Sequence, residues 1–166
     1  MTLTALLPTL RRSLPDPLDP RHWPEHTTST VDDVVIGGVS LVRLCDLEGT
    51  PCVLTGDLSH VRAREARARG IGTDVTVVVC RITRVESTDA GAIAIVDGAL
   101  DTVAAHGPEC RLIGRVSTAK PVAFGLHGGA GSHGQISVSL PADLRPGDLI
   151  ALPCRGAVAL HDVRVR

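Results

Sequence analysis

The chain has 166 residues, which is long enough for one domain with a buried core, and its formal net charge is −1. With one Trp, one Phe, no Tyr and no basic excess, it lacks the stacking surface and positive field of nucleic-acid-binding proteins. No apolar run approaches the ~20 residues that span a bilayer, so we expect no membrane partner.

Five cysteines are scattered along the chain, and none forms a CxxC pair. We therefore expect no zinc ribbon or finger. Four of the five lie in apolar runs, as small buried side chains do. Because the N-terminus has an early proline and no basic segment, it is a poor signal peptide, and the whole pattern predicts a reducing, cytoplasmic setting.

Residues 1–30 are predicted to form an arm, because Pro8, Pro15, Pro17, Pro20 and Pro24 prevent a long helix. Its leucines at 3, 6, 7 and 10 suit one short amphipathic turn, and the single Trp, at position 23, is expected to pin the arm to the body.

Residues 31–166 are predicted to form one domain, in which residues 31–72 lead into a main sheet over residues 73–166. The lead-in reads as a strand at 34–36, a helix at 39–48, a strand at 51–54 and a helix at 60–69, with Gly49 and Gly70 as helix stops.

From residue 73 the apolar period changes to that of strands. The predicted strands are residues 74–86, 92–96, 110–116, 122–124, 135–140, 148–153 and 157–165. About seven strands with short turns indicate a mainly β fold, a small closed or nearly closed β-barrel or sandwich with one or two short flanking helices.

A glycine-rich loop between residues 125 and 134 is the first candidate site. It carries His127 and His133, which are general acid–base candidates because imidazole titrates near neutral pH. The alternative is that both are ordinary loop residues. The loop also matches GxGxxG, but a strand follows where a dinucleotide site needs a helix. No third metal ligand stands at helpful spacing, so we expect no metal.

Further candidates surround this loop. Asp97 and Asp101 flank a turn and are candidate catalytic carboxylates, although capping of the turn is their commoner role. Cys154 is a candidate nucleophile against the alternative of a buried thiol. His161 and Asp162, on the last predicted strand, point to opposite faces. The residues expected to bind a ligand are Gly128, Gly129, Gly131, Ser132, Arg155 and Val158.

The chain resembles diaminopimelate decarboxylase in two separated parts. Ile36–Leu41 and Glu48–Leu54 (EGTPCVL) are similar to the segment that precedes the family's barrel, and His22–Pro24 is similar to a motif of its actinobacterial members. In the second half, Val96–Leu100 (VDGAL) and Leu144–Pro153 (LRPGDLIALP) are similar to the family's C-terminal β-domain. The resemblance implies that β-domain as the fold.

The family's pyridoxal phosphate is held in a (β/α)₈ barrel, and here the helix at 60–69 leads straight into the main sheet. The barrel and its Schiff-base lysine are therefore missing, and Lys120 lies in the β-domain run. Gly128 and Gly129 stand where the family has catalytic Cys and Glu, and Val158 replaces its Tyr. We expect no cofactor and no decarboxylation.

Two functions remain. In the first, the chain is a repurposed remnant of a decarboxylase β-domain that works without pyridoxal phosphate. It would be a small cyclase, isomerase or lyase of specialised metabolism that uses His or Asp on an apolar or carboxylate-bearing substrate. In the second, it is a non-catalytic binding or dimerisation partner of an intact decarboxylase-like enzyme. In either case a homodimer is expected, because the family dimerises through this domain.

Overall fold

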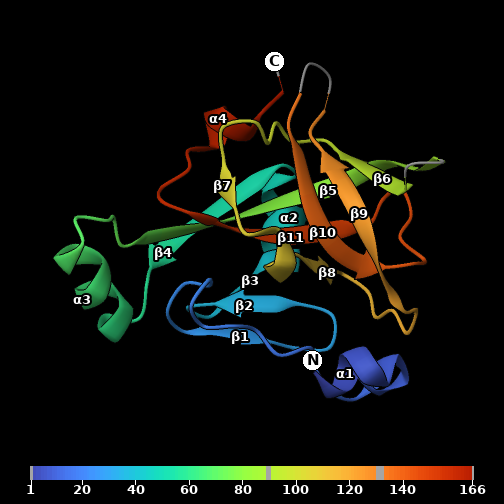
Figure 1. Cartoon of the computed structure of the whole chain (residues 1–166), viewed down its shortest axis with the longest axis horizontal. Helices are drawn as coiled ribbons and strands as arrows, with labels where there is room; N and C mark the ends of the chain where they lie inside the picture. The colour runs from blue at the N-terminus through green and yellow to red at the C-terminus, as the bar shows by residue number, and fades with distance from the viewer. Residues whose placement is uncertain (1, 89–90, 130–132, 166) are drawn as a thin grey trace.

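The computed structural model describes residues 2–88, 91–129 and 133–165. Its main element is an eight-stranded sheet in the order β10-β9-β6-β5-β11-β7, with β4 paired to β5 and β8 paired to β11 (Figure 1). The strands are β4 (Cys52–Asp57), β5 (Asp74–Thr88), β6 (Gly91–Val96), β7 (Ala104–Ala105), β8 (Arg111–Ile113), β9 (Pro121–His127), β10 (Gln135–Pro141) and β11 (Leu149–Arg155). All the pairs are antiparallel except β6 with β9. The predicted mainly β fold is confirmed.

Strand β5 carries the core on both of its faces. Val77 and Val79 belong to an apolar cluster under the N-terminal part of the chain, which includes Trp23. Val78, Cys80 and Ile82 belong to a second cluster inside the curled sheet. This division follows from the period of 2 in a strand, which sends successive side chains to opposite faces.

The sheet curls until the 3₁₀ turn η2 (Gly107–Glu109) lies against the edge strand β10. A Cβ atom at Gly107 would lie 2.1 Å from the backbone oxygen of Ser137, so only glycine permits this approach. Contact between η2 and β10 nearly closes the barrel.

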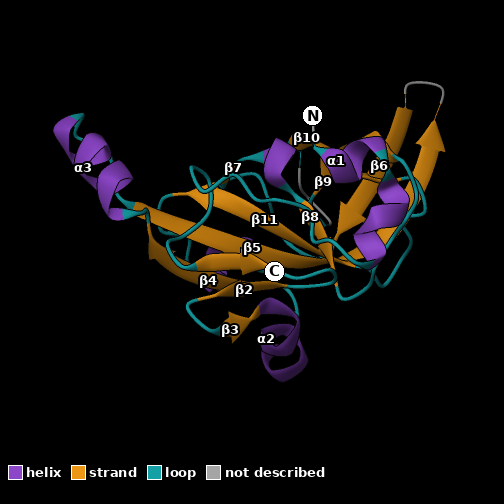
Figure 2. Ribbon diagram, turned by 90° about the horizontal axis from the view of Figure 1, so that it is seen from below, coloured by secondary structure: helices purple, strands orange, loops and turns teal. Residues whose placement is uncertain are grey.

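A three-stranded sheet of β1 (Thr27–Ser29), β2 (Val34–Ile36) and β3 (Val39–Ser40) packs below the main sheet. Helix α2 (Leu41–Glu48) follows, and its first turn is capped by the Ser40 hydroxyl, which accepts from the Arg43 amide at 3.0 Å. Helix α3 (His60–Ala68) extends away from the sheet, as Figure 2 shows. Both helices were predicted.

The arm contains α1 (Leu3–Leu6) and the 3₁₀ turn η1 (Pro8–Arg12). Trp23 has 1% of its surface exposed and anchors the arm, as predicted. Strand β1 pairs with β2 across residue 30, and the division into an arm of residues 1–30 and one domain stays a prediction.

The end of the chain corrects one expectation. Residues 157–165 were predicted to be a strand, but they form helix α4 (Leu160–Val163), in which the Asp162 carboxylate accepts from the Ala159 amide at 3.2 Å. His161 and Asp162 therefore do not point to opposite faces, and their side chains pair at 3.1 Å. Within the described ranges, no helix is long and apolar enough to cross a membrane.

Replacing Ile82 by Ala is expected to lower the free energy of unfolding by about 2–5 kcal/mol, because it opens a cavity where two strand pairs meet. The matched control is Ile71→Ala, where the side chain is 42% exposed, against 1% for Ile82, and the expected change is within about 0.5 kcal/mol. Urea unfolding of both variants measures the difference. Equal losses would contradict this account of the core.

Candidate functional site

The glycine-rich loop joins β9 to β10. His127, the last residue of β9, is half-buried and pairs through its backbone with Gln135. His133 is exposed, and its amide donates to the Asp101 carboxylate at 2.8 Å. Gly134 donates to the same oxygen at 2.7 Å. Asp101 thus anchors the loop to the turn in which it lies.

The described glycines of the loop are held against the protein itself. Gly128 is buried, and the Gly129 amide donates to the Gly98 carbonyl at 2.8 Å. A Cβ atom at Gly129 would lie 2.8 Å from the Cγ2 atom of Val165. The space beside Gly129 is therefore filled by the C-terminal segment. Gly131 and Ser132 lie outside the described residues.

Asp97 and Val158 hold the backbone in place. The Asp97 carboxylate accepts from the Arg81 amide at 2.9 Å and also from the Thr50 hydroxyl. The Val158 amide donates to the Thr76 hydroxyl at 3.0 Å, and its side chain packs against the inner core. Both residues therefore make contacts within the fold itself.

A cavity of about 540 Å³ lies elsewhere, between α3, the arm, β7 and the end of β11. We refer to it as the α3 pocket. Among the sequence-predicted residues, Cys154 and Arg155 line it, whereas His127, His133, Asp97 and Asp101 do not. Among the described residues, the structure therefore divides the predicted site residues between two places, with Asp101 and His133 in contact at the glycine-rich loop and Cys154 and Arg155 at the α3 pocket.

Two histidines that sequence reasoning missed line the α3 pocket. The rings of His22 and His106 are stacked, with centroids 3.5 Å apart and planes 9° from parallel. Burial lowers the pKa of His22, and the neighbouring His106 lowers it further. At neutral pH this pair offers an uncharged imidazole that can accept a proton.

The Glu109 carboxylate brings the two histidines together. One of its oxygens accepts from the Asp19 amide at 3.1 Å, from the Trp23 indole at 2.9 Å and from Arg111 at 3.1 Å. Since Trp23 follows His22 and Glu109 lies one turn after His106, the same contact that fixes the arm also aligns the two rings. Only folding brings these distant residues together, so no sequence spacing revealed the pair.

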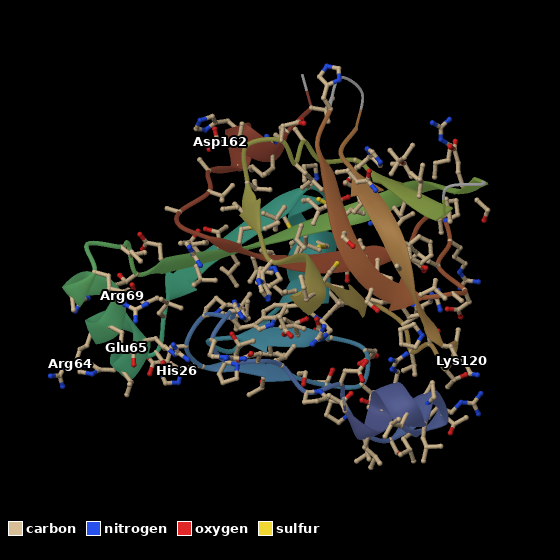
Figure 3. All side chains as sticks on the ribbon, viewed as in Figure 1. His26, Arg64, Glu65, Arg69, Lys120 and Asp162 are labelled. Carbon is tan, nitrogen blue, oxygen red and sulfur yellow. The ribbon has the colours of Figure 1, made fainter. Side chains whose placement is uncertain are left out.

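Arginine side chains also line the α3 pocket. Arg62 pairs with Glu65 at 3.1 Å on α3, whereas Arg69 and Arg155 have no ion-pair partner among the residues described. In Figure 3, Glu65 and Arg69 are seen on α3, and Arg64, which does not line the pocket, points away from the body. Free guanidinium groups favour a ligand that carries a carboxylate or a phosphate.

The Cys154 thiol is a poor nucleophile in this setting. Burial raises its pKa to about 12, and its Sγ atom donates to the Leu152 carbonyl at 3.5 Å. A thiol with this pKa stays protonated at neutral pH. Cys154 therefore acts as part of the pocket wall.

A smaller cavity of about 190 Å³ lies between the arm and β8, and its three arginines are already paired. Arg11 lies 2.9 Å from Asp16, Arg111 bonds to Glu109, and Arg115 holds Asp148 at 2.7 Å through two nitrogens. The α3 pocket is thus the cavity with unpaired cations.

The described residues do not fit pyridoxal phosphate bound through a lysine. Lys120 is the only lysine of the chain, it lines neither pocket, and Figure 3 shows it on the opposite side of the molecule from α3. Over the described ranges, no group of three His, Cys, Asp or Glu side chains is arranged to hold a metal ion.

No family model matches the chain, and no curated protein matches its sequence significantly. Among solved structures, it is similar to the arginine decarboxylase of Paramecium bursaria Chlorella virus, with 16% identity and a TM-score of 0.39 over 54% of this chain and 28% of that one. The agmatine-bound form of that enzyme gives the same values. A diaminopimelate decarboxylase has 15% identity and a TM-score of 0.39 over 63% of this chain and 34% of its own. The chain therefore spans about a third of the length of these enzymes.

The stability of the protein is expected to fall as the pH is lowered through about 6.5, the ordinary pKa of histidine. Folded His22 binds a proton more weakly than the unfolded chain does, so acidification through this range favours unfolding. His22→Phe keeps a ring in the stack and should remove this part of the pH dependence, as followed by urea unfolding between about pH 8 and pH 5.

The control for this experiment is His161→Gln, since that side chain is 82% exposed on α4. It should keep the wild-type pH dependence. Asp19 acts only at lower pH, because hydrogen bonds and charge from Arg21 hold its pKa well below the usual range. An unchanged pH slope in His22→Phe would show that the pair does not titrate as described.

Proposed function

We propose that the chain is a small enzyme that binds a carboxylate-bearing substrate in the α3 pocket and transfers a proton with His22 and His106. The reaction class is an isomerisation, cyclisation or elimination without pyridoxal phosphate. The observation that carries the proposal is the stacked histidine pair on the wall of a cavity of about 540 Å³. A specialised-metabolism role, a cytoplasmic location and a homodimer belong to the same proposal.

Arg69 and Arg155 support the choice of substrate. Each is an exposed, unpaired cation on the pocket wall among the residues described, and a guanidinium binds a carboxylate through two parallel hydrogen bonds. A substrate held there would lie in the same cavity as the two imidazoles. Binding and orientation are the terms that such a pocket contributes to rate.

His22 and His106 support the choice of chemistry. Burial lowers the pKa of His22, so near neutral pH its uncharged imidazole can accept a proton from a bound substrate, and the stacked His106 ring lies beside it. The glycine-rich loop, where sequence reasoning placed catalysis, is left as a structural hairpin in this proposal.

A second candidate is the non-catalytic binding or dimerisation partner. It is favoured by the exposed leucines of the arm, since Leu3, Leu6 and Leu7 are each more than half exposed. Large exposed apolar side chains that gather on one helix mark interaction surfaces. This second candidate function is supported if no small molecule binds in the α3 pocket.

The binding step is tested by thermal unfolding with acetate, succinate, glutamate, diaminopimelate and inorganic phosphate as probes. At least one carboxylate is expected to raise the unfolding midpoint, because a ligand that binds only the folded state stabilises it. Arg155→Gln should weaken that binding about 10-fold or more, through loss of a charge-assisted hydrogen-bond pair. Arg12→Gln, far from the pocket, is the matched control.

The catalytic step uses whichever carboxylate binds. Its C–H hydrogens should exchange with D₂O in the presence of the protein, as followed by NMR, and His106→Asn should abolish exchange while it leaves binding in place. His127→Asn is the matched control and should exchange like the wild type. A protein that binds none of the probes, or exchanges equally in both variants, would contradict the proposal.

Pyridoxal phosphate added to the protein is expected to give no imine absorbance and no rise in the unfolding midpoint. Lys120 is exposed at the start of β9, and no other residue supplies a side-chain amine. Absorbance spectroscopy and thermal unfolding with and without the cofactor measure this. A stable imine on Lys120, lost in Lys120→Arg, would overturn the assignment.

A further inference from the structure

Two of the five cysteines touch each other. The Sγ atoms of Cys45 and Cys52 are 3.4 Å apart, which is van der Waals contact. Cys45 lies in the last turns of α2, and Cys52 is the first residue of β4. Each side chain is nearly buried, with 3% and 1% of its surface exposed, and both belong to the outer apolar cluster.

The other three thiols lack such a contact. Cys80, Cys110 and Cys154 are buried in the inner cluster, and over the described ranges none has a sulfur atom within bonding contact of its own. Burial raises the pKa of Cys110 to about 12 and that of Cys80 well above its ordinary value. Their thiols are therefore held in the inert protonated form.

We propose that Cys45 and Cys52 are a reversible oxidation site, at which hydrogen peroxide converts the two thiols into a disulfide between α2 and β4. The Cys52 sulfur attacks one peroxide oxygen, so that the O–O bond breaks and a sulfenic acid and one water form. The Cys45 sulfur then attacks the Cys52 sulfur and displaces the second water. Two S–H bonds are lost and one S–S bond is gained, and a dithiol reductant reverses the reaction.

The hydrogen bond between the two thiols favours one order of attack. It lowers the pKa of Cys52 and raises that of Cys45. Cys52 is therefore the thiolate that meets peroxide first, and Cys45 resolves the product. The sulfur atoms need to approach by only about 1.4 Å to reach disulfide bond length.

A short surface segment covers the two thiols. Six residues, 46–51, join the two cysteines, and the first four of them are exposed, with Leu47 79% exposed. A short surface segment with few buried contacts opens locally at low free-energy cost. Peroxide is small enough to enter through such an opening, and larger disulfide oxidants are not.

The experiment treats the full chain with hydrogen peroxide and counts free thiols after denaturation. The count is expected to fall from five to three, since one disulfide consumes two thiols, and dithiothreitol should restore it. The intact mass should fall by two hydrogens. After cleavage at Glu48, which lies between the cysteines, the two fragments should stay joined until reduction. The oxidised protein should unfold roughly 5 °C higher, because a loop of eight residues is closed.

Two variants make the outcome specific. Cys45→Ser should lose no pair of thiols under the same treatment, whereas Cys110→Ser, a buried control, should still lose two. Thermal unfolding confirms that each variant is folded before oxidation. If wild type keeps five thiols while free glutathione in the same tube is oxidised, or if the linked peptides contain other cysteines, the proposal is overturned.

Discussion

The fold depends on the double burial of β5. This strand supplies Val77 and Val79 to the outer cluster and Val78 and Cys80 to the inner one, so neither face is free to meet water. A slip of one residue in its register would exchange the two sets of side chains. Every other strand of the main sheet is placed, directly or through one neighbour, by its pairing with β5, except β10 at the far edge. The strand therefore connects the arm, the lead-in helices and the barrel in one cooperative unit.

The arm is part of this unit because of one carboxylate. Glu109 receives donors from the arm and from β8, and the Trp23 ring fills the space beside the outer face of β5. The energetic anchor is the buried indole, and the direction comes from the three hydrogen bonds. The α3 pocket results from this arrangement, since the arm closes one side of a space that α3 leaves open on the other.

Much of the fold was predictable because its signals are local. The serine cap and the glycine stop directly flank α2, and the alternating valines of β5 lie within a single short stretch of sequence. The prediction of a last strand was wrong, because apolar and polar residues alternate only weakly over residues 157–165. A local turn held by Asp162 forms a helix there instead. The glycine-rich loop drew attention through composition, which does not show that Asp101 and Val165 fill its surroundings. The His22–His106 stack depends on a long-range tether, and no local pattern encodes it.

The tether on Glu109 also has a consequence for evolvability. A single oxygen accepts three hydrogen bonds, two from the arm and one from β8, so any substitution there alters both the anchoring of the arm and the orientation of the two rings. A substitution at Glu109 therefore cannot change the anchoring of the arm without also changing the orientation of the two histidine rings. Changes in ligand preference are therefore expected mainly in α3, an outlying helix in which only Ala63 is buried. The side chains of α3 that line the pocket can change while the barrel stays intact.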